Sequence, residues 1–121
     1  MARLLVIDDD IDLATLTSIR LTKAGHEVQS AHDGTSGLAA IRSTRPELVV
    51  LDWMMPGMDG IEVAQAVRAD AAIAETPLVM LTAKSGASDV DRALEAGVDV
   101  VMTKPYAPAE LTARIASILA A

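Results

Sequence analysis

Five short runs of apolar, β-forming residues, each followed by a segment of helical spacing, restrict this chain to a small set of folds. The runs cover residues 4–7, 26–31, 47–51, 77–81 and 98–102. Strands that alternate with helices at this length form a mostly parallel sheet with helices on both faces, because each right-handed crossover places its helix on one side or the other. We therefore predict an α/β domain of five β-α units.

The helical segments are marked by apolar residues three or four positions apart and by glycine or proline at their ends. Four of the strands are nearly unbroken apolar runs, as burial on both faces requires, whereas HEVQSA (26–31) alternates and is predicted to be an edge strand. The helical residues are Leu13, Leu16 and Ile19 before Gly25, Leu38 and Ile41 before Pro46, Ile61, Ala64 and Val67 after Gly60, Val90 and Leu94 before Gly97, and Leu111, Ile115 and Ile118 after Pro108.

Length and charge exclude several classes of protein. A chain of 121 residues buries one core, so we expect a single domain over residues 1–121. Ten basic against seventeen acidic residues, a net charge of -7, argue against direct binding of nucleic acid. With no cysteine, disulfides and thiolate metal sites are absent, and no apolar run approaches the roughly 20 residues that span a bilayer. We expect a cytoplasmic protein without membrane contact.

Polar side chains follow four of the predicted strands, at the point where each strand ends. In an open parallel sheet, ligands bind outside the carboxyl ends of the strands, so these side chains are expected to share one crevice. They are Asp8, Asp9 and Asp10 after the first strand, Asp52 after the third, Thr82 after the fourth and Lys104 after the fifth.

This combination of side chains fits a site for a phosphoryl group. Several carboxylates in one crevice repel each other unless a hard cation neutralises them, and Mg²⁺ typically binds one or two carboxylates together with water and phosphate oxygens. Asp8 and Asp9 can hold the metal, Lys104 can supply an ammonium, and Thr82 can supply a hydroxyl. Asp52 is then left as the nucleophile that forms an aspartyl phosphate.

Four motifs in the same order and spacing make the sequence resemble, over its whole length, the receiver domain of bacterial two-component response regulators. They are the acidic pair after the first strand, the block LDWMMPGMDG, the tripeptide LTA and the tetrapeptide TKPY. The resemblance implies a flavodoxin-like, doubly wound (βα)5 fold with strand order 2-1-3-4-5. It also implies a cis peptide between Lys104 and Pro105.

The same resemblance implies roles for the residues of the crevice. Asp52 is the expected phosphoacceptor, assisted by Thr82 and Lys104. The expected cofactor is Mg²⁺, bound by Asp9, Asp52 and the backbone carbonyl of Met54, with Asp8 close by and holding a metal-bound water.

The expected partners are a histidine kinase or phosphotransfer protein that supplies the phosphoryl group, and a downstream effector protein or domain. Such a domain catalyses only its own phosphorylation and dephosphorylation, so it is not an enzyme in the usual sense. Phosphorylation is expected to switch a protein-binding surface made by the fourth helix, the fifth strand and the fifth helix, and to permit a homodimer.

The motifs are most similar to receivers attached to winged-helix DNA-binding domains, with two departures. Val101 stands three positions before Lys104, where the family usually has a Tyr or Phe that turns inward on phosphorylation, and Tyr106 is not its equivalent. Val100 stands where that subfamily usually has an Asp that pairs with the basic residue corresponding to Arg114. The first departure removes the usual aromatic side chain of the switch. The second removes the acidic partner of the usual salt bridge across the dimer.

The same residues allow plainer interpretations and rival functions. The three aspartates after the first strand suit a solvated loop, with Asp10 as a helix N-cap. An aspartate-dependent phosphohydrolase would need a second Asp two positions after Asp52, where the chain has Met54. A nucleotide or flavin binder would need a glycine-rich loop that is missing. A degenerate receiver that serves only as a protein-binding scaffold is disfavoured, because every position that the chemistry needs is filled. Trp53 is expected to shield the rim of the crevice.

Overall fold

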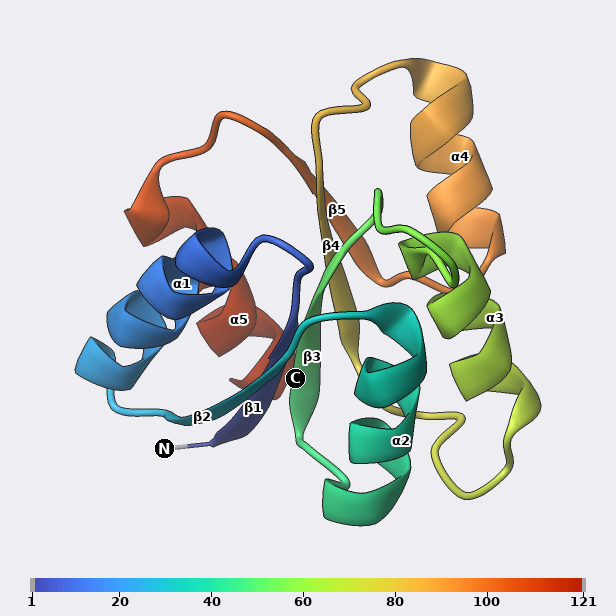
Figure 1. Ribbon diagram of the computed structural model, residues 1–121. Helices are drawn as coiled ribbons and strands as arrows, with labels where there is room; N and C mark the ends of the chain where they lie inside the picture. Colours follow the sequence, from blue (N-terminus) through green and yellow to red (C-terminus); the bar gives the residue numbers. More distant parts are fainter. Residues whose placement is uncertain (1, 121) are drawn as a thin grey trace.

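The computed structural model describes residues 2–120, in which five parallel strands alternate with five helices (Figure 1). The sheet order is β2-β1-β3-β4-β5, which confirms the predicted fold. The strands are β1 (Arg3–Ile7), β2 (Glu27–Ala31), β3 (Leu48–Asp52), β4 (Leu78–Thr82) and β5 (Val100–Thr103). The helices are α1 (Ile11–Lys23), α2 (Gly34–Thr44), α3 (Gly60–Ala69), α4 (Ala87–Glu95) and α5 (Pro108–Ala120).

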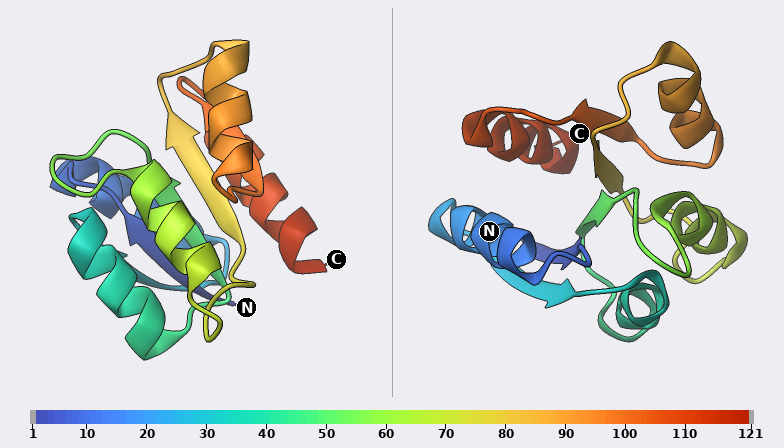
Figure 2. Two further views of the ribbon diagram at one scale, coloured as in Figure 1. Left: turned by 90° about the vertical axis from the view of Figure 1, so that its right-hand side faces the viewer. Right: turned by 45° about the horizontal axis from the view of Figure 1, so that its top comes forward.

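The sheet lies between two layers of helices, with α1 and α5 on one face and α2, α3 and α4 on the other (Figure 2). Successive side chains of a strand point to opposite faces, so each central strand contributes to two separate hydrophobic clusters. In β1, Leu4 and Val6 belong to the cluster under α1 and α5, whereas Leu5 and Ile7 belong to the cluster under the other three helices. Burial on both faces explains why these strands are nearly unbroken apolar runs.

The alternating run is the edge strand, as predicted. β2 pairs only with β1 among the described strands. Its residues Glu27, Gln29 and Ser30 are exposed, Val28 is half-buried, and only Ala31 is fully buried.

Helix α1 turns a different side to the sheet from the one that its large apolar residues suggest. Ala14 and Leu21 are buried, as is Thr17 between them. The large residues of the same helix are exposed: Ile11, Leu13, Leu16 and Ile19 each have more than two fifths of their surface in solvent, at 59%, 43%, 42% and 47%. The side of α1 that faces the sheet therefore carries Ala14, Thr17 and Leu21.

Aspartate side chains begin three of the helices. The carboxylate of Asp10 accepts a hydrogen bond from the amide of Leu13, which confirms the predicted cap of α1. Asp33 caps α2 in the same way. Asp59 begins α3 with a reciprocal capping box, in which Glu62 accepts from the Asp59 amide. These caps fix the helix starts next to the strand ends.

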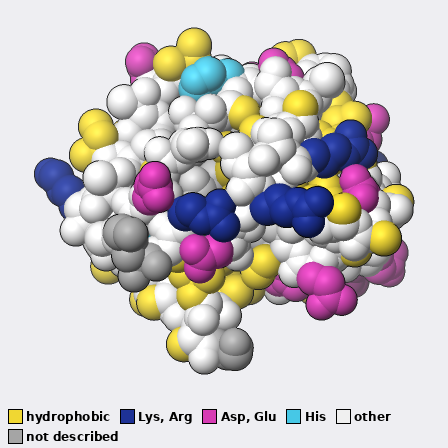
Figure 3. Space-filling model, turned by 90° about the horizontal axis from the view of Figure 1, so that it is seen from below, with side chains coloured by type: hydrophobic (Ala, Val, Ile, Leu, Met, Phe, Trp, Pro, Cys, Tyr) yellow, Lys and Arg dark blue, Asp and Glu magenta, His cyan; other side chains and the backbone are white. Residues whose placement is uncertain are grey.

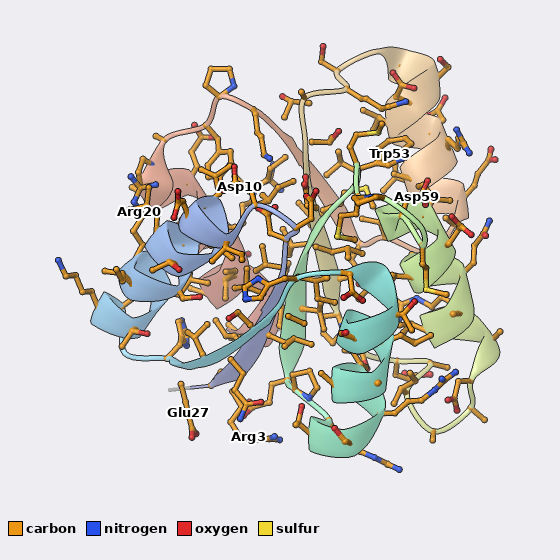
Figure 4. The ribbon with its side chains drawn as sticks, in the orientation of Figure 1. Arg3, Asp10, Arg20, Glu27, Trp53 and Asp59 are labelled. Carbon is orange, nitrogen blue, oxygen red and sulfur yellow. The ribbon has the colours of Figure 1, made fainter. Side chains whose placement is uncertain are left out.

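The amino ends of the strands form a face of mixed charge. Figure 3 views the molecule from this side and shows Lys and Arg side chains lying beside acidic ones. Arg3, labelled in Figure 4, donates hydrogen bonds to the carbonyls of Thr44 and Arg45 at this end. None of the helices described is both long and apolar enough to cross a membrane.

Candidate functional site

Asp52 is the last residue of β3 and pairs with a cation across the sheet. Its Oδ1 accepts a hydrogen bond from Lys104 Nζ at 3.3 Å, and its side chain is only 13% exposed. Lys104 follows β5, where its amide donates to the carbonyl of Thr82 at 2.7 Å. The Lys104–Pro105 peptide is cis, as predicted. The buried strand therefore ends on a carboxylate that meets an ammonium.

Two further carboxylates complete an acidic cluster at the same carboxyl end of the sheet. Oxygen atoms of Asp8, Asp9 and Asp52 all lie within 4.8 Å of one another. Asp8 is buried and its Oδ1 accepts a hydrogen bond from the Asp10 amide at 3.0 Å, whereas Asp9 is exposed. Figure 4 shows Asp10 just after β1, at the end of the sheet where the carboxyl ends of the strands lie.

Burial opposes the charge on two of these carboxylates. Desolvation raises the pKa of Asp8 to about 6, although the hydrogen bond from the Asp10 amide partly offsets this. Desolvation also raises the pKa of Asp52, and the nearby Lys104 ammonium acts in the opposite direction. Lys104 therefore offsets only part of the cost of burying charge at Asp52, and a bound cation would offset more of it.

The donor set fits a hard divalent cation such as Mg²⁺. Carboxylate oxygens are the ligands that this ion prefers, and three of them converge here. The carbonyl of Met54 as a further ligand stays a prediction. Met54 itself is 58% exposed.

Thr82 supplies a hydroxyl at the end of the neighbouring strand. Its side chain is 1% exposed, and β4 lies beside β3 with Leu81 opposite Asp52. Its Oγ1 accepts a hydrogen bond from the Lys84 amide at 2.9 Å. A hydroxyl that accepts one hydrogen bond still has its own hydrogen to donate. The structure thus brings Asp8, Asp9, Asp52, Thr82 and Lys104 together at the carboxyl end of the sheet, as the sequence predicts.

The tyrosine after the cis peptide lies on the opposite side of the sheet from Val101. Tyr106 packs against the cluster under α1 and α5, and it lines a cavity of about 220 Å³ next to Lys104 and Arg20. Val101 packs against the cluster under α2, α3 and α4. Tyr106 is therefore not placed as an equivalent of the usual aromatic residue.

Trp53 is a member of the site that sequence reasoning placed wrongly. It is 1% exposed, so it lies deeper than the rim that it was expected to shield. Lys84 Nζ lies 4.9 Å from the centroid of its ring, and Arg92 Cζ lies 5.8 Å from it. These three residues come from the loop after β3, the loop after β4, and α4. No residue pattern near Trp53, Lys84 or Arg92 predicts that these three side chains meet.

The chain is similar to known proteins over nearly its whole length. The family model of the response regulator receiver domain matches residues 4–116. The DNA-binding response regulator MtrA of Mycobacterium tuberculosis (strain ATCC 25618 / H37Rv) is 47% identical over 113 residues, which is 93% of this chain and 48% of that protein. The regulator RpaA of Synechocystis is 40% identical over 119 residues, 98% of this chain and 49% of that protein. The chain thus spans about half the length of these curated relatives.

Solved structures show the same fold. The chemotaxis protein CheY4 of Vibrio cholerae has a TM-score of 0.91 and 31% identity, with 98% of each chain covered. The receiver domain of the Francisella response regulator 1452 has a TM-score of 0.93 and 29% identity, covering 99% of this chain and 98% of that one.

Proposed function

Because the chain belongs to the response regulator receiver domain family, we propose that residues 1–121 form one such domain, which accepts a phosphoryl group on Asp52. The donor is a phosphohistidine of a partner kinase or phosphotransfer protein. The observation that supports this most directly is the Asp52 carboxylate, held by Lys104 at 3.3 Å within a cluster of three aspartates.

The chemistry is a transfer between two nucleophiles. An Asp52 carboxylate oxygen attacks the phosphorus, a new O–P bond forms, and the P–N bond to the donor imidazole breaks. The electron pair of that bond stays on the imidazole nitrogen. The product is an aspartyl phosphate, and water can later attack it to restore the carboxylate.

The surrounding side chains act by charge and position. Lys104 follows the negative charge from the Asp52 carboxylate to the phosphoryl oxygens, and the Thr82 hydroxyl donates to one of those oxygens. Asp8 and Asp9, with Asp52 and the Met54 carbonyl, would hold Mg²⁺. When bound, this ion neutralises negative charge on the phosphoryl group and on the carboxylates.

The proposed output is a change in a protein-binding surface. Thr82 ends β4 just before the loop that leads to α4, and Lys104 begins the loop that leads to α5. Both groups that would contact the phosphoryl group therefore connect to the surface of α4, β5 and α5. The relatives MtrA and RpaA are DNA-binding regulators. We propose that this surface signals to an effector domain or protein, or to a second copy of the chain, in the cytoplasm.

Intact mass spectrometry after incubation with acetyl phosphate and Mg²⁺ tests the phosphoacceptor. We expect one phosphate on the wild type and none on Asp52→Asn, because an amide cannot act as the nucleophile. Asp12→Asn, in the exposed first turn of α1, is the control and should accept one phosphate. Phosphate on Asp52→Asn at the wild-type level would move the acceptor elsewhere.

Mg²⁺ binding should depend on Asp9. In a Mg²⁺ titration followed by Trp53 emission, we expect Asp9→Ala to weaken binding about tenfold or more, since one of few charged ligands is lost. Asp12→Asn again serves as the control. If the Asp9→Ala titration matches that of the wild type, the ion lies at another place.

Lys104→Arg should separate phosphorylation from signalling. The guanidinium is a planar fork and cannot take the position of a compact ammonium that contacts Asp52 at 3.3 Å. We expect the variant to accept phosphate by mass but to show a weaker phosphorylation-dependent change at α4 and α5, measured by hydrogen exchange. A full wild-type change there would show that Lys104 does not carry the signal.

A further inference from the structure

Two cations contact the ring of Trp53, and one of them comes from the loop next to the phosphoacceptor. We propose that the ring binds the Lys84 ammonium in the unphosphorylated domain, and that Lys84 moves from the ring to the phosphoryl oxygens once Asp52 is phosphorylated. The inference rests on the function proposed above. Trp53 is in this view a positioning residue, and Lys84 is a further residue that binds the phosphoryl group.

The position of Lys84 is set by the site itself. Its amide donates to Thr82 Oγ1 at 2.9 Å, so its backbone is tied to the hydroxyl that faces the phosphoryl group. Its ammonium lies 4.9 Å from the centroid of the Trp53 ring, and Trp53 directly follows Asp52 in the chain. The Lys84 ammonium sits on a flexible four-carbon stem, so a change of side-chain rotamer can carry it from the ring toward the end of β3.

The charge of the phosphorylated site favours this move. A phosphoryl group carries close to two negative charges at neutral pH, and it is added beside the carboxylates of Asp8 and Asp9. Mg²⁺ and Lys104 together bring three positive charges against about four negative ones. Lys84 is the one basic residue in the loops 53–59 and 83–86. An ionic contact of its ammonium with phosphoryl oxygens is stronger than its contact with the face of an aromatic ring.

The second cation on the ring provides a matched comparison. Arg92 lies on α4, with its Cζ 5.8 Å from the same centroid, and Figure 4 shows Trp53 between the loop after β3 and α4. Arg92 is eight residues further along the chain than Lys84 and is not tied to Thr82. We expect it to stay on the ring after phosphorylation.

Beryllofluoride, a mimic of the phosphoryl group on aspartate, tests the inference in saturating Mg²⁺. Binding is measured by ¹⁹F NMR, which does not depend on Trp53, and the indole is followed separately by its emission. We expect Lys84→Met to weaken beryllofluoride binding about tenfold and Lys84→Arg to restore most of it, because the charge is kept. Arg92→Met should bind like the wild type. Lys84→Met should also lose much of the emission change that accompanies binding.

Two results would overturn the inference while leaving the proposed function intact. One is wild-type affinity for beryllofluoride in Lys84→Met. The other is an equal loss of affinity in Lys84→Met and Arg92→Met, which would indicate a general effect of positive charge rather than a contact. Failure of the wild type to bind beryllofluoride or accept phosphate defeats the proposed function and this inference together.

Discussion

Gly60→Ala is expected to lower the free energy of unfolding by about 3 kcal/mol, because the new methyl group has no room. A Cβ at this position would lie 2.5 Å from the carbonyl oxygen of Asp52 and 2.9 Å from the Cα of Trp53. Both are backbone atoms, which cannot turn aside as a side chain does. The first turn of α3 must then move away from the end of β3, and the hydrogen bond from the Gly60 amide to the Trp53 carbonyl, 2.8 Å long, is strained.

Urea unfolding followed by circular dichroism measures this loss. Gly86→Ala is the control, because its Cβ would meet only the end of the Asp89 side chain at 3.2 Å, and we expect a change within about 1 kcal/mol. Phosphate acceptance by folded Gly60→Ala should also fall, since the displaced backbone belongs to Asp52. A Gly60→Ala protein as stable as the wild type would show that α3 and β3 can separate freely.

Asp8→Asn is expected to stabilise the metal-free domain at pH 7.5 by about 2 to 3 kcal/mol. The pKa of Asp8 is about 6 in the folded domain against 3.8 for the ordinary group, and a shift of one unit corresponds to about 1.4 kcal/mol. A raised pKa means that the folded state holds the proton more tightly than the unfolded state. The stability contributed by protonated Asp8 is present below pH 4 and is lost as the pH rises to about 6. Above that pH, the neutral amide removes the cost.

The measurement is urea unfolding in EDTA at pH 7.5 and at pH 4, where the difference between Asp8→Asn and wild type should shrink toward zero. Asp12→Asn should change stability by no more than about 0.5 kcal/mol at either pH. Adding Mg²⁺ should narrow the gap at pH 7.5, because an ion that binds the folded state stabilises it, and the wild type keeps a carboxylate at the site that Asp8→Asn has lost. An equal effect of Asp8→Asn at both pH values would mean that burial of its charge is not the cause.

Much of the fold follows from pattern alone, because burial on both faces of a parallel sheet imposes unbroken apolar strands. The same rule identifies β2 as the edge strand. Because the strands are parallel, their carboxyl ends lie on one side of the sheet, and this brings Asp8, Asp52 and Lys104 together. Strand order and the cis peptide came instead from the resemblance to a family, because spacing alone does not distinguish among the possible orders of five strands.

Two features lay beyond the pattern. The exposed Leu16 and Ile19 of α1 show that large apolar residues do not always mark the buried side of a helix, since the buried side of α1 carries Ala14 and Thr17 as well as Leu21. The contact of Trp53 with Lys84 joins segments about 30 residues apart. It depends on how the loops after β3 and β4 settle against α4, which no periodicity encodes.

The strand order divides the charge of the site between the two halves of the chain. The carboxylates of Asp8, Asp9 and Asp52 come from the first 52 residues, which also supply the three adjacent strands β2, β1 and β3. The hydroxyl of Thr82 comes from β4, and the ammonium of Lys104 comes from the residue after β5, the strand that forms the other edge of the sheet. If that edge opens in a partial unfolding event, the carboxylates lose their counter-charge at once. The first half of the chain alone, during synthesis or after proteolysis, would carry Asp52 but neither the Thr82 hydroxyl nor the Lys104 ammonium.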